Sequence, residues 1–184
     1  MKVIIIFALV AFFSDVTPPK GGIDEAVRAI KQFYAETAVA ISLAQKGEPG
    51  GLYSNELVIN SRNGSWRAVG NYRKTMTFWY SDQPEFVAQE GKSPESALGK
   101  VEINETASVR SLYREFLFKE GNLVFYFQRE KAGEESDLEE RCYFADNNLL
   151  VRLAPGAETE RFTPQPIFQE AKYLQKLFLS TFAE

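Results

Sequence analysis

The sequence contains no histidine and a single cysteine, and these two absences exclude several kinds of chemistry. Without histidine there is no Ser-His-Asp or Cys-His catalysis and no His-ligated zinc or haem. Cys142 alone cannot form an intramolecular disulfide, a cysteine zinc cluster or an iron–sulfur site. The dinucleotide-binding and P-loop glycine motifs and the EF-hand spacing are also missing. The sequence therefore indicates no cofactor, no metal and no catalytic residue of these classes.

Positive charge is sparse as well. The chain has 21 Lys and Arg against 25 Asp and Glu, which gives a net charge of −4, and no dense basic patch occurs. We therefore expect no nucleic-acid partner. Hydrophobic residues make up 45% and aromatic residues 14% of the 184 residues, enough to form a real core. This length suits one domain, which we place at 23–184.

No apolar run is long enough to span a membrane as a helix. The longest, Val3 to Phe13, has eleven residues, whereas a spanning helix needs about 20. Because the run follows Met1-Lys2 and ends before a Pro-Pro pair, it is typical of a signal peptide. We predict a signal peptide at 1–14, a lead-in at 15–22 and an exported protein, periplasmic or extracellular. The alternative is that the run forms a buried first strand.

The hydrophobic pattern predicts an α+β fold. Helical spacing of apolar residues indicates one helix near each end of the domain, and alternating patterns indicate six to eight strands between them. We expect a curved antiparallel sheet with both helices packed on one face. The predicted elements are a helix at Ile23–Lys46, strands at Leu52–Ile59, Tyr72–Tyr80 and Lys100–Ala107, a mobile polar loop at Ser81–Leu98, two hairpins, a linker at Arg129–Asp137 and a helix at Pro166–Phe182.

The two hairpins have similar sequences, 26 residues apart. Arg114 to Phe125 and Glu140 to Val151 share a phenylalanine, an asparagine and a leucine around the turn. Glu120-Gly121 and Asp146-Asn147 occupy equivalent places and suit two-residue loops, in which both central residues have positive φ. These turns predict the hairpin register.

That register separates the side chains into two faces. We expect Phe116 opposite Phe125 and Cys142 opposite Val151, which makes Cys142 a core residue. The core face then carries Phe116, Phe118, Leu123, Phe125, Phe127, Cys142, Phe144, Leu149, Val151 and Leu153. The second face is mixed and carries Tyr113, Glu115, Leu117, Val124, Tyr126, Arg141, Tyr143, Leu150 and Arg152.

The mixed face has three possible explanations. A helix or loop covers it, it binds a partner or a second copy of the chain, or it lines a concave ligand site. Tyrosine and arginine are enriched in binding surfaces. Two tryptophans could add stacking contacts to sugar or lipid groups. The candidate binding residues are Tyr113, Glu115, Tyr126, Arg141, Tyr143, Arg152, Trp66 and Trp79.

The hairpins also resemble two known groups of proteins. The segments Phe116 to Leu123 and Cys142 to Leu149, with Trp79-Tyr80-Ser81 after Gly70 and Tyr72, resemble small exported bacterial proteins of unknown function. The likeness spans residues 23–154. A weaker similarity is to MORN-type repeats, hairpins that scaffold protein or lipid contacts. Neither resemblance implies a catalytic residue.

We therefore expect an exported, non-catalytic binding module, whose partner is a protein or a small apolar or carbohydrate ligand. One alternative is a hydrolase that acts on carbohydrate or lipid with two carboxylates in a cleft, such as Glu115, Glu139 or Glu140. Glu115 and Arg141, however, have the placement of a cross-strand ion pair. A second alternative is a half-barrel that carries lipid.

Overall fold

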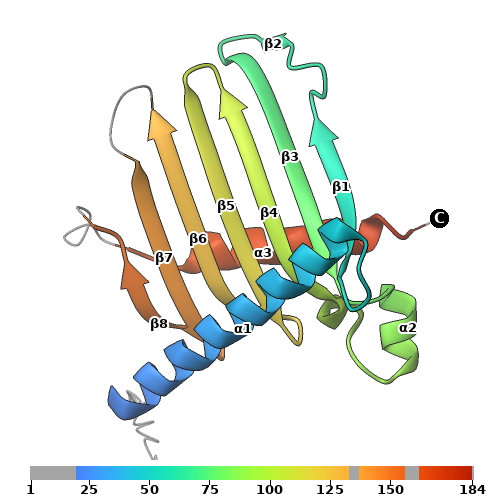
Figure 1. Ribbon diagram of the computed structural model, residues 1–184. Coiled ribbons are helices and arrows are strands. Elements are labelled where there is room, and N and C mark those ends of the chain that lie inside the picture. The colour runs from blue at the N-terminus through green and yellow to red at the C-terminus, as the bar shows by residue number, and fades with distance from the viewer. Residues whose placement is uncertain (1–19, 133–136, 156–161, 184) are drawn as a thin grey trace, which may run out of the picture.

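The computed structural model describes residues 20–132, 137–155 and 162–183. The predicted signal peptide and residues 15–19 of the lead-in lie outside these ranges. Within them, the chain forms the expected α+β fold, an eight-stranded antiparallel sheet with an N-terminal and a C-terminal helix packed on it (Figure 1). No helix in this part of the chain is long and apolar enough to cross a membrane.

The elements follow the predicted order. The sheet runs β1-β3-β4-β5-β6-β7-β8, with the short β2 paired to β3. The bounds are α1 Lys20–Lys46, β1 Tyr53–Ile59, β2 Ser65–Trp66, β3 Gly70–Tyr80, α2 Pro84–Gln89, the 3-10 helix η1 Pro94–Ala97, β4 Leu98–Ala107, β5 Arg110–Lys119, β6 Asn122–Ala132, β7 Leu138–Ala145, β8 Asn148–Leu153 and α3 Gln165–Ser180.

Three local predictions need correction. The polar segment at 81–98 is not a plain loop, because Pro84 and Pro94 each begin a short helix, the position in which proline costs no hydrogen bond. The helix α1 also begins at Lys20, inside the predicted lead-in. Residues 129–132 of the predicted linker extend β6.

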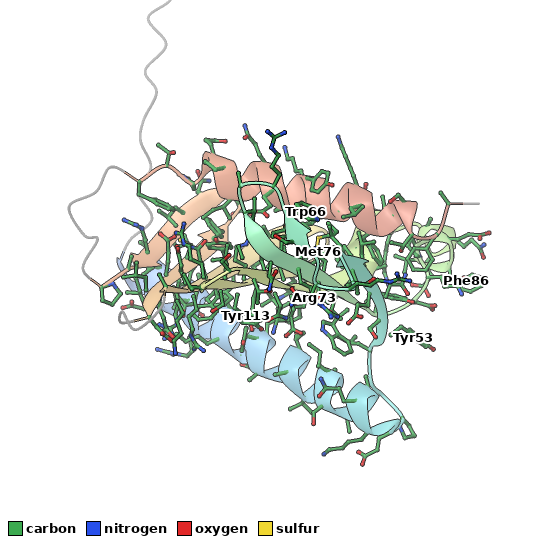
Figure 2. The ribbon with its side chains drawn as sticks, turned by 90° about the horizontal axis from the view of Figure 1, so that it is seen from above. Tyr53, Trp66, Arg73, Met76, Phe86 and Tyr113 are labelled. Atoms are coloured by element: carbon green, nitrogen blue, oxygen red, sulfur yellow. The ribbon has the colours of Figure 1, made fainter. Side chains whose placement is uncertain are left out.

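The two long helices lie on opposite faces of the sheet, not on one. Figure 2, viewed from above, shows the sheet between α1 and α3. Ile167, Leu174 and Phe178 of α3 pack with Phe78, Phe116 and other residues of one face. On the other face, Ile30 of α1 packs with Leu117, Phe125, Phe127 and Tyr143. The sheet therefore has a core on each side.

The hairpin turns agree with the prediction. Lys119 pairs with Asn122 and Ala145 pairs with Asn148, so each loop has two residues. Glu120 and Gly121 have φ of 52° and 79°, and Asp146 and Asn147 have φ of 49° and 60°. Positive φ at both positions defines the turn that matches the right-handed twist of the strands.

Immediately after each turn, however, the register shifts. Phe118 still pairs with Leu123 and Phe144 with Leu149, as predicted. The next pairs are Leu117 with Phe125 and Tyr143 with Val151, so Val124 and Leu150 are extra residues in β-bulges. The predicted pairs Phe116–Phe125 and Cys142–Val151 are therefore wrong.

The bulges exchange side chains between the two faces, because one extra residue reverses the alternation beyond it. Phe125, Phe127 and Val151 move from the predicted core face to the α1 face. Leu153 moves with them as the partner of Arg141 and is half exposed. In the opposite direction, Tyr126 pairs with Phe116 and Arg152 pairs with Cys142, both on the α3 face.

We predict that Cys142 is inert in the folded protein. Its side chain is fully buried in the α3 core, as expected from the sequence, and burial raises the pKa of the thiol to about 12. Because the thiolate is the reactive form, a thiol reagent such as dithionitrobenzoate at pH 8 should label the protein only after denaturation. Rapid labelling of the native protein would contradict this placement.

Candidate functional site

The α1 helix crosses the sheet diagonally (Figure 1). A pocket lies at its edge. The pocket has a volume of about 480 Å³ and lies between α1 and the strands β5, β6 and β7. We call it the α1 pocket. It is lined by Ile30, Lys31, Tyr34, Tyr113, Glu115, Phe125, Phe127, Arg129, Arg141 and Tyr143.

The floor of the α1 pocket is aromatic. Phe125 and Tyr143 are cross-strand partners whose ring centroids are 5.1 Å apart. Tyr34 of α1 meets the edge of Phe125 at 5.4 Å between centroids. Phe127 lies one step further along β6, next to Tyr113 at 6.1 Å. These contacts hold the rings in place, so the floor is preorganised for an apolar ligand.

Beside this floor lies a group of charges, which we call the Lys100 cluster: the buried Lys100 and Glu115 and the half-buried Glu102. Glu102 on β4 and Glu115 on β5 are direct cross-strand partners. Such like charges repel each other. Lys100 Nζ lies 2.8 Å from Glu102 Oε1 and 3.0 Å from Glu115 Oε1, and it compensates both carboxylates. Lys100 and Glu115 are only 5% and 6% exposed.

Hydroxyl and indole groups complete the cluster. Tyr34 of α1 donates a hydrogen bond of 2.8 Å to Glu115 Oε2, and Tyr113 donates to Glu115 Oε1. Trp79 Nε1 donates to Glu102 Oε2 at 3.1 Å. Both oxygens of each carboxylate therefore have partners. Tyr34 also places its ring 5.0 Å from Lys100 Nζ, so this one residue joins α1 to the buried charges.

The cluster shifts the pKa values of its members. Burial acts to raise the pKa of Glu102, but the contact with Lys100 outweighs it and holds that pKa below its usual range. Burial likewise acts to lower the pKa of Lys100, but Glu115 and Glu102 outweigh it and raise that pKa. Burial and the bond to Glu115 raise the pKa of Tyr113 far above its usual value. All three groups keep their usual charge at neutral pH.

The outer rim of the pocket is cationic. Arg129 and Arg141 lie over the Phe127 ring, with guanidinium carbons 5.5 and 5.0 Å from its centroid. Glu139 accepts hydrogen bonds from both, 2.8 Å from Arg129 Nε and 2.6 Å from Arg141 Nη2. Lys31 of α1 approaches the Tyr143 ring at 5.8 Å. Cations from three elements thus surround the aromatic floor.

Four of the eight predicted binding residues meet in the α1 pocket: Tyr113, Glu115, Arg141 and Tyr143. The predicted Glu115–Arg141 ion pair is wrong, because Lys100 and the tyrosines occupy Glu115 and Arg141 pairs with Glu139. The mixed face is covered, in large part by α1, which is one of the three explanations that the sequence left open.

The other four residues lie elsewhere. Tyr126 is buried on the α3 face, and Arg152 pairs there with Glu140, because the bulges reverse their side chains. Trp79 is buried and supports Glu102. Trp66 is exposed at the β2–β3 turn, where it stacks on Tyr72 at 4.5 Å between centroids, away from the pocket.

Several lining residues are not among the sequence-based candidates. Phe125 and Phe127 were predicted on the core face and lie on the α1 face instead. Tyr34 lies on α1, and its partner Glu115 is 81 positions away in the sequence. No local pattern links the two.

No metal site accompanies the pocket, since the described residues contain no group of three or more Asp, Glu or Cys side chains that could hold an ion. Comparison of the chain with protein-family models, curated proteins and solved structures finds no significant match.

We predict that Lys100→Met destabilises the protein by about 3–5 kcal/mol, because the buried Glu115 and the half-buried Glu102 lose their counter-charge. Lys74→Met is the matched control. Lys74 lies 3.8 Å from Glu105 on a more exposed part of the sheet, and its loss should cost at most about 1 kcal/mol. Urea unfolding measures both. Equal losses of unfolding free energy in the two variants would show that Lys100 is not the counter-charge of a buried cluster.

A second prediction concerns alkaline pH. Since the folded protein raises the pKa of Tyr113, the unfolded chain releases this proton first, near its usual value of 10.0. The free energy of unfolding should therefore fall as pH rises above about 10. In Tyr113→Phe this fall should be shallower, because one such group is removed. Parallel pH profiles for the two proteins would contradict the buried Tyr113–Glu115 contact.

Proposed function

We propose that this protein is an exported, non-catalytic binding module that holds a small ligand in the α1 pocket. The observation that carries the proposal is the composition of that pocket. Fixed aromatic rings form its floor, and a few charged groups converge on it from α1, β6 and β7. A volume of about 480 Å³ falls within the range of small-molecule sites.

The arrangement of the carboxylates favours binding over hydrolysis. A glycosidase needs one carboxyl group that stays protonated near neutral pH and a second that faces the substrate. Here Glu115 and Glu102 have both oxygens engaged, and the pKa of Glu102 is lowered, not raised. Glu139 and Glu140 are paired with arginines. A structural role explains each of these carboxylates.

The covering helix also favours a small ligand over a partner protein on the mixed face. Ile30 and Tyr34 of α1 contact the sheet at Phe125 and Glu115. A flat partner would have to displace this helix and break the bond to Glu115. A small molecule can enter at the side of α1, where the pocket is open.

A blocking label tests the proposal. Lys31 is exposed at the mouth of the pocket, so Lys31→Cys can be modified with a bulky maleimide while Cys142 stays buried. The neutral dye N-phenyl-1-naphthylamine should bind the unmodified protein saturably and at one site. The label at position 31 should weaken dye binding by about tenfold or more, which corresponds to about 1.4 kcal/mol.

The matched control is a maleimide on Val39→Cys. Val39 lies on the same helix, 61% exposed and outside the pocket lining. This label should leave dye binding unchanged. If the label at position 31 also has no effect, or if the dye does not bind saturably, the α1 pocket is not a ligand site.

Export is supported by the sequence alone. Met1-Lys2 followed by the apolar run to Phe13 has the composition of a signal peptide. Residues 1–22 fused to alkaline phosphatase, which is active only outside the bacterial cytoplasm, should give phosphatase activity in whole cells. Replacing two leading apolar residues, Ile5 and Phe7, with Asp should abolish it. An inactive unmodified fusion would refute export.

A further inference from the structure

The two arginines at the rim of the α1 pocket have unused hydrogen-bonding capacity. Each guanidinium group carries five N–H donors, and Glu139 accepts one hydrogen bond from each. The side chains of Arg129 and Arg141 are 47% and 38% exposed, so their remaining donors are accessible from solvent. Their stacking on Phe127 fixes both groups next to the aromatic floor. This geometry suits a second anion.

The charges around the rim leave an excess of positive charge. Asp137 approaches Arg129 loosely, at 4.0 Å, and Glu139 lies between the arginines. With Lys31 of α1, three cations therefore face two surface carboxylates. Glu115, the carboxylate within the pocket lining, shares Lys100 with Glu102, so the positive excess is confined to the rim. An anionic group at the rim would thus meet net attraction.

The pocket changes from apolar to charged along the strands. Cross-strand partners on this face form rows. The first row, which lies beneath α1, consists of Leu117, Phe125 and Tyr143. The next row contains Phe127 and Arg141, and the third contains Tyr113 and Arg129. Successive rows on one face are two residues apart, about 7 Å. Phe125 and the outer arginine, Arg129, are therefore separated by about 13 Å along the strand, the extent of a ligand with an apolar body and a charged end.

The surface beyond the arginines is polar. A second hollow of about 460 Å³ shares Tyr113 and Arg129 with the α1 pocket. It is lined in addition by Asn104, Thr106, Ser111 and Lys131, and by the carboxylates Glu105 and Asp137. The charged end of a ligand would point toward these groups and toward water. The apolar end would lie under α1, where the aromatic rings exclude water.

We propose that the ligand of the α1 pocket is an amphipathic carboxylate, with an apolar body on Phe125 and Tyr143 and its carboxylate on the N–H donors of Arg129 and Arg141 that Glu139 does not use. Planar guanidinium groups bind a carboxylate through parallel hydrogen bonds, which favours this head group. The inference rests on the proposed function, in which the α1 pocket is the ligand site.

Three chain-matched probes test the head group: decanoate, decanol and decyltrimethylammonium, each displacing N-phenyl-1-naphthylamine from the pocket. Decanoate should bind at least about tenfold more tightly than decanol, because charge-assisted hydrogen bonds add to the same apolar contact. The cation should bind most weakly. Raising the salt concentration should weaken the binding of decanoate and leave the binding of decanol unchanged.

Paired variants locate the head group. The double variant Arg129→Gln/Arg141→Gln should bind decanoate about tenfold or more weakly than the unmodified protein does. Its affinity for decanol should be unchanged. The control is Arg73→Gln with Arg110→Gln, two exposed arginines outside the pocket, which removes the same charge. Arg141→Lys keeps the charge without the planar donors and should give an intermediate loss.

The outcomes separate this inference from the proposed function. If decanol and decanoate bind equally and the arginine variants change neither, the carboxylate head group is refuted, while the pocket remains a ligand site. If the dye binds but none of the three amphiphiles displaces it, the carboxylate head group is likewise refuted and the pocket remains a ligand site. If the label at position 31 does not block the dye, the proposed function fails first.

Discussion

The two β-bulges that follow the hairpin turns decide which side chains face each helix. Val124 and Leu150 each add one residue to a strand, and every side chain beyond them is reversed. With these residues in place, Phe125 and Phe127 oppose α1, while Phe116 and Phe118 remain under α3. Both faces of the sheet are therefore aromatic. Each must be covered, and the two amphipathic helices cover one face each.

The α1 face differs from the α3 face because it contains buried charge. The α3 face is closed by apolar packing around Phe178. Under α1, Lys100 and Glu115 are buried, and an unpaired charge in such a place costs several kcal/mol. Tyr34 supplies one of the required hydrogen bonds, which fixes the position of α1 on the sheet. The pocket lies beside this contact, so the same helix both closes the core and forms a wall of the site.

Much of the fold could be predicted from the sequence, and the reason for each failure is physical. Helix periodicity, alternating strands and the turns at Glu120-Gly121 and Asp146-Asn147 depend on local patterns, and all are present. The bulges are not visible in this way, because Val124 and Leu150 are apolar residues that suit either register. Only part of the candidate set therefore comes together: Tyr143 keeps its predicted face and lines the α1 pocket, whereas Tyr126 does not. Which helix covers which face depends on contacts distant in sequence.

The register of the first hairpin is the most direct test of this account. A nuclear Overhauser spectrum of isotope-labelled protein reports which residues are opposite each other on β5 and β6. We expect cross-strand contacts of Leu117 with Phe125 and of Phe116 with Tyr126, together with contacts between the rings of Phe125 and Tyr34. Contacts of Phe116 with Phe125 would show that Val124 is not bulged. In that case the aromatic floor of the α1 pocket would not exist.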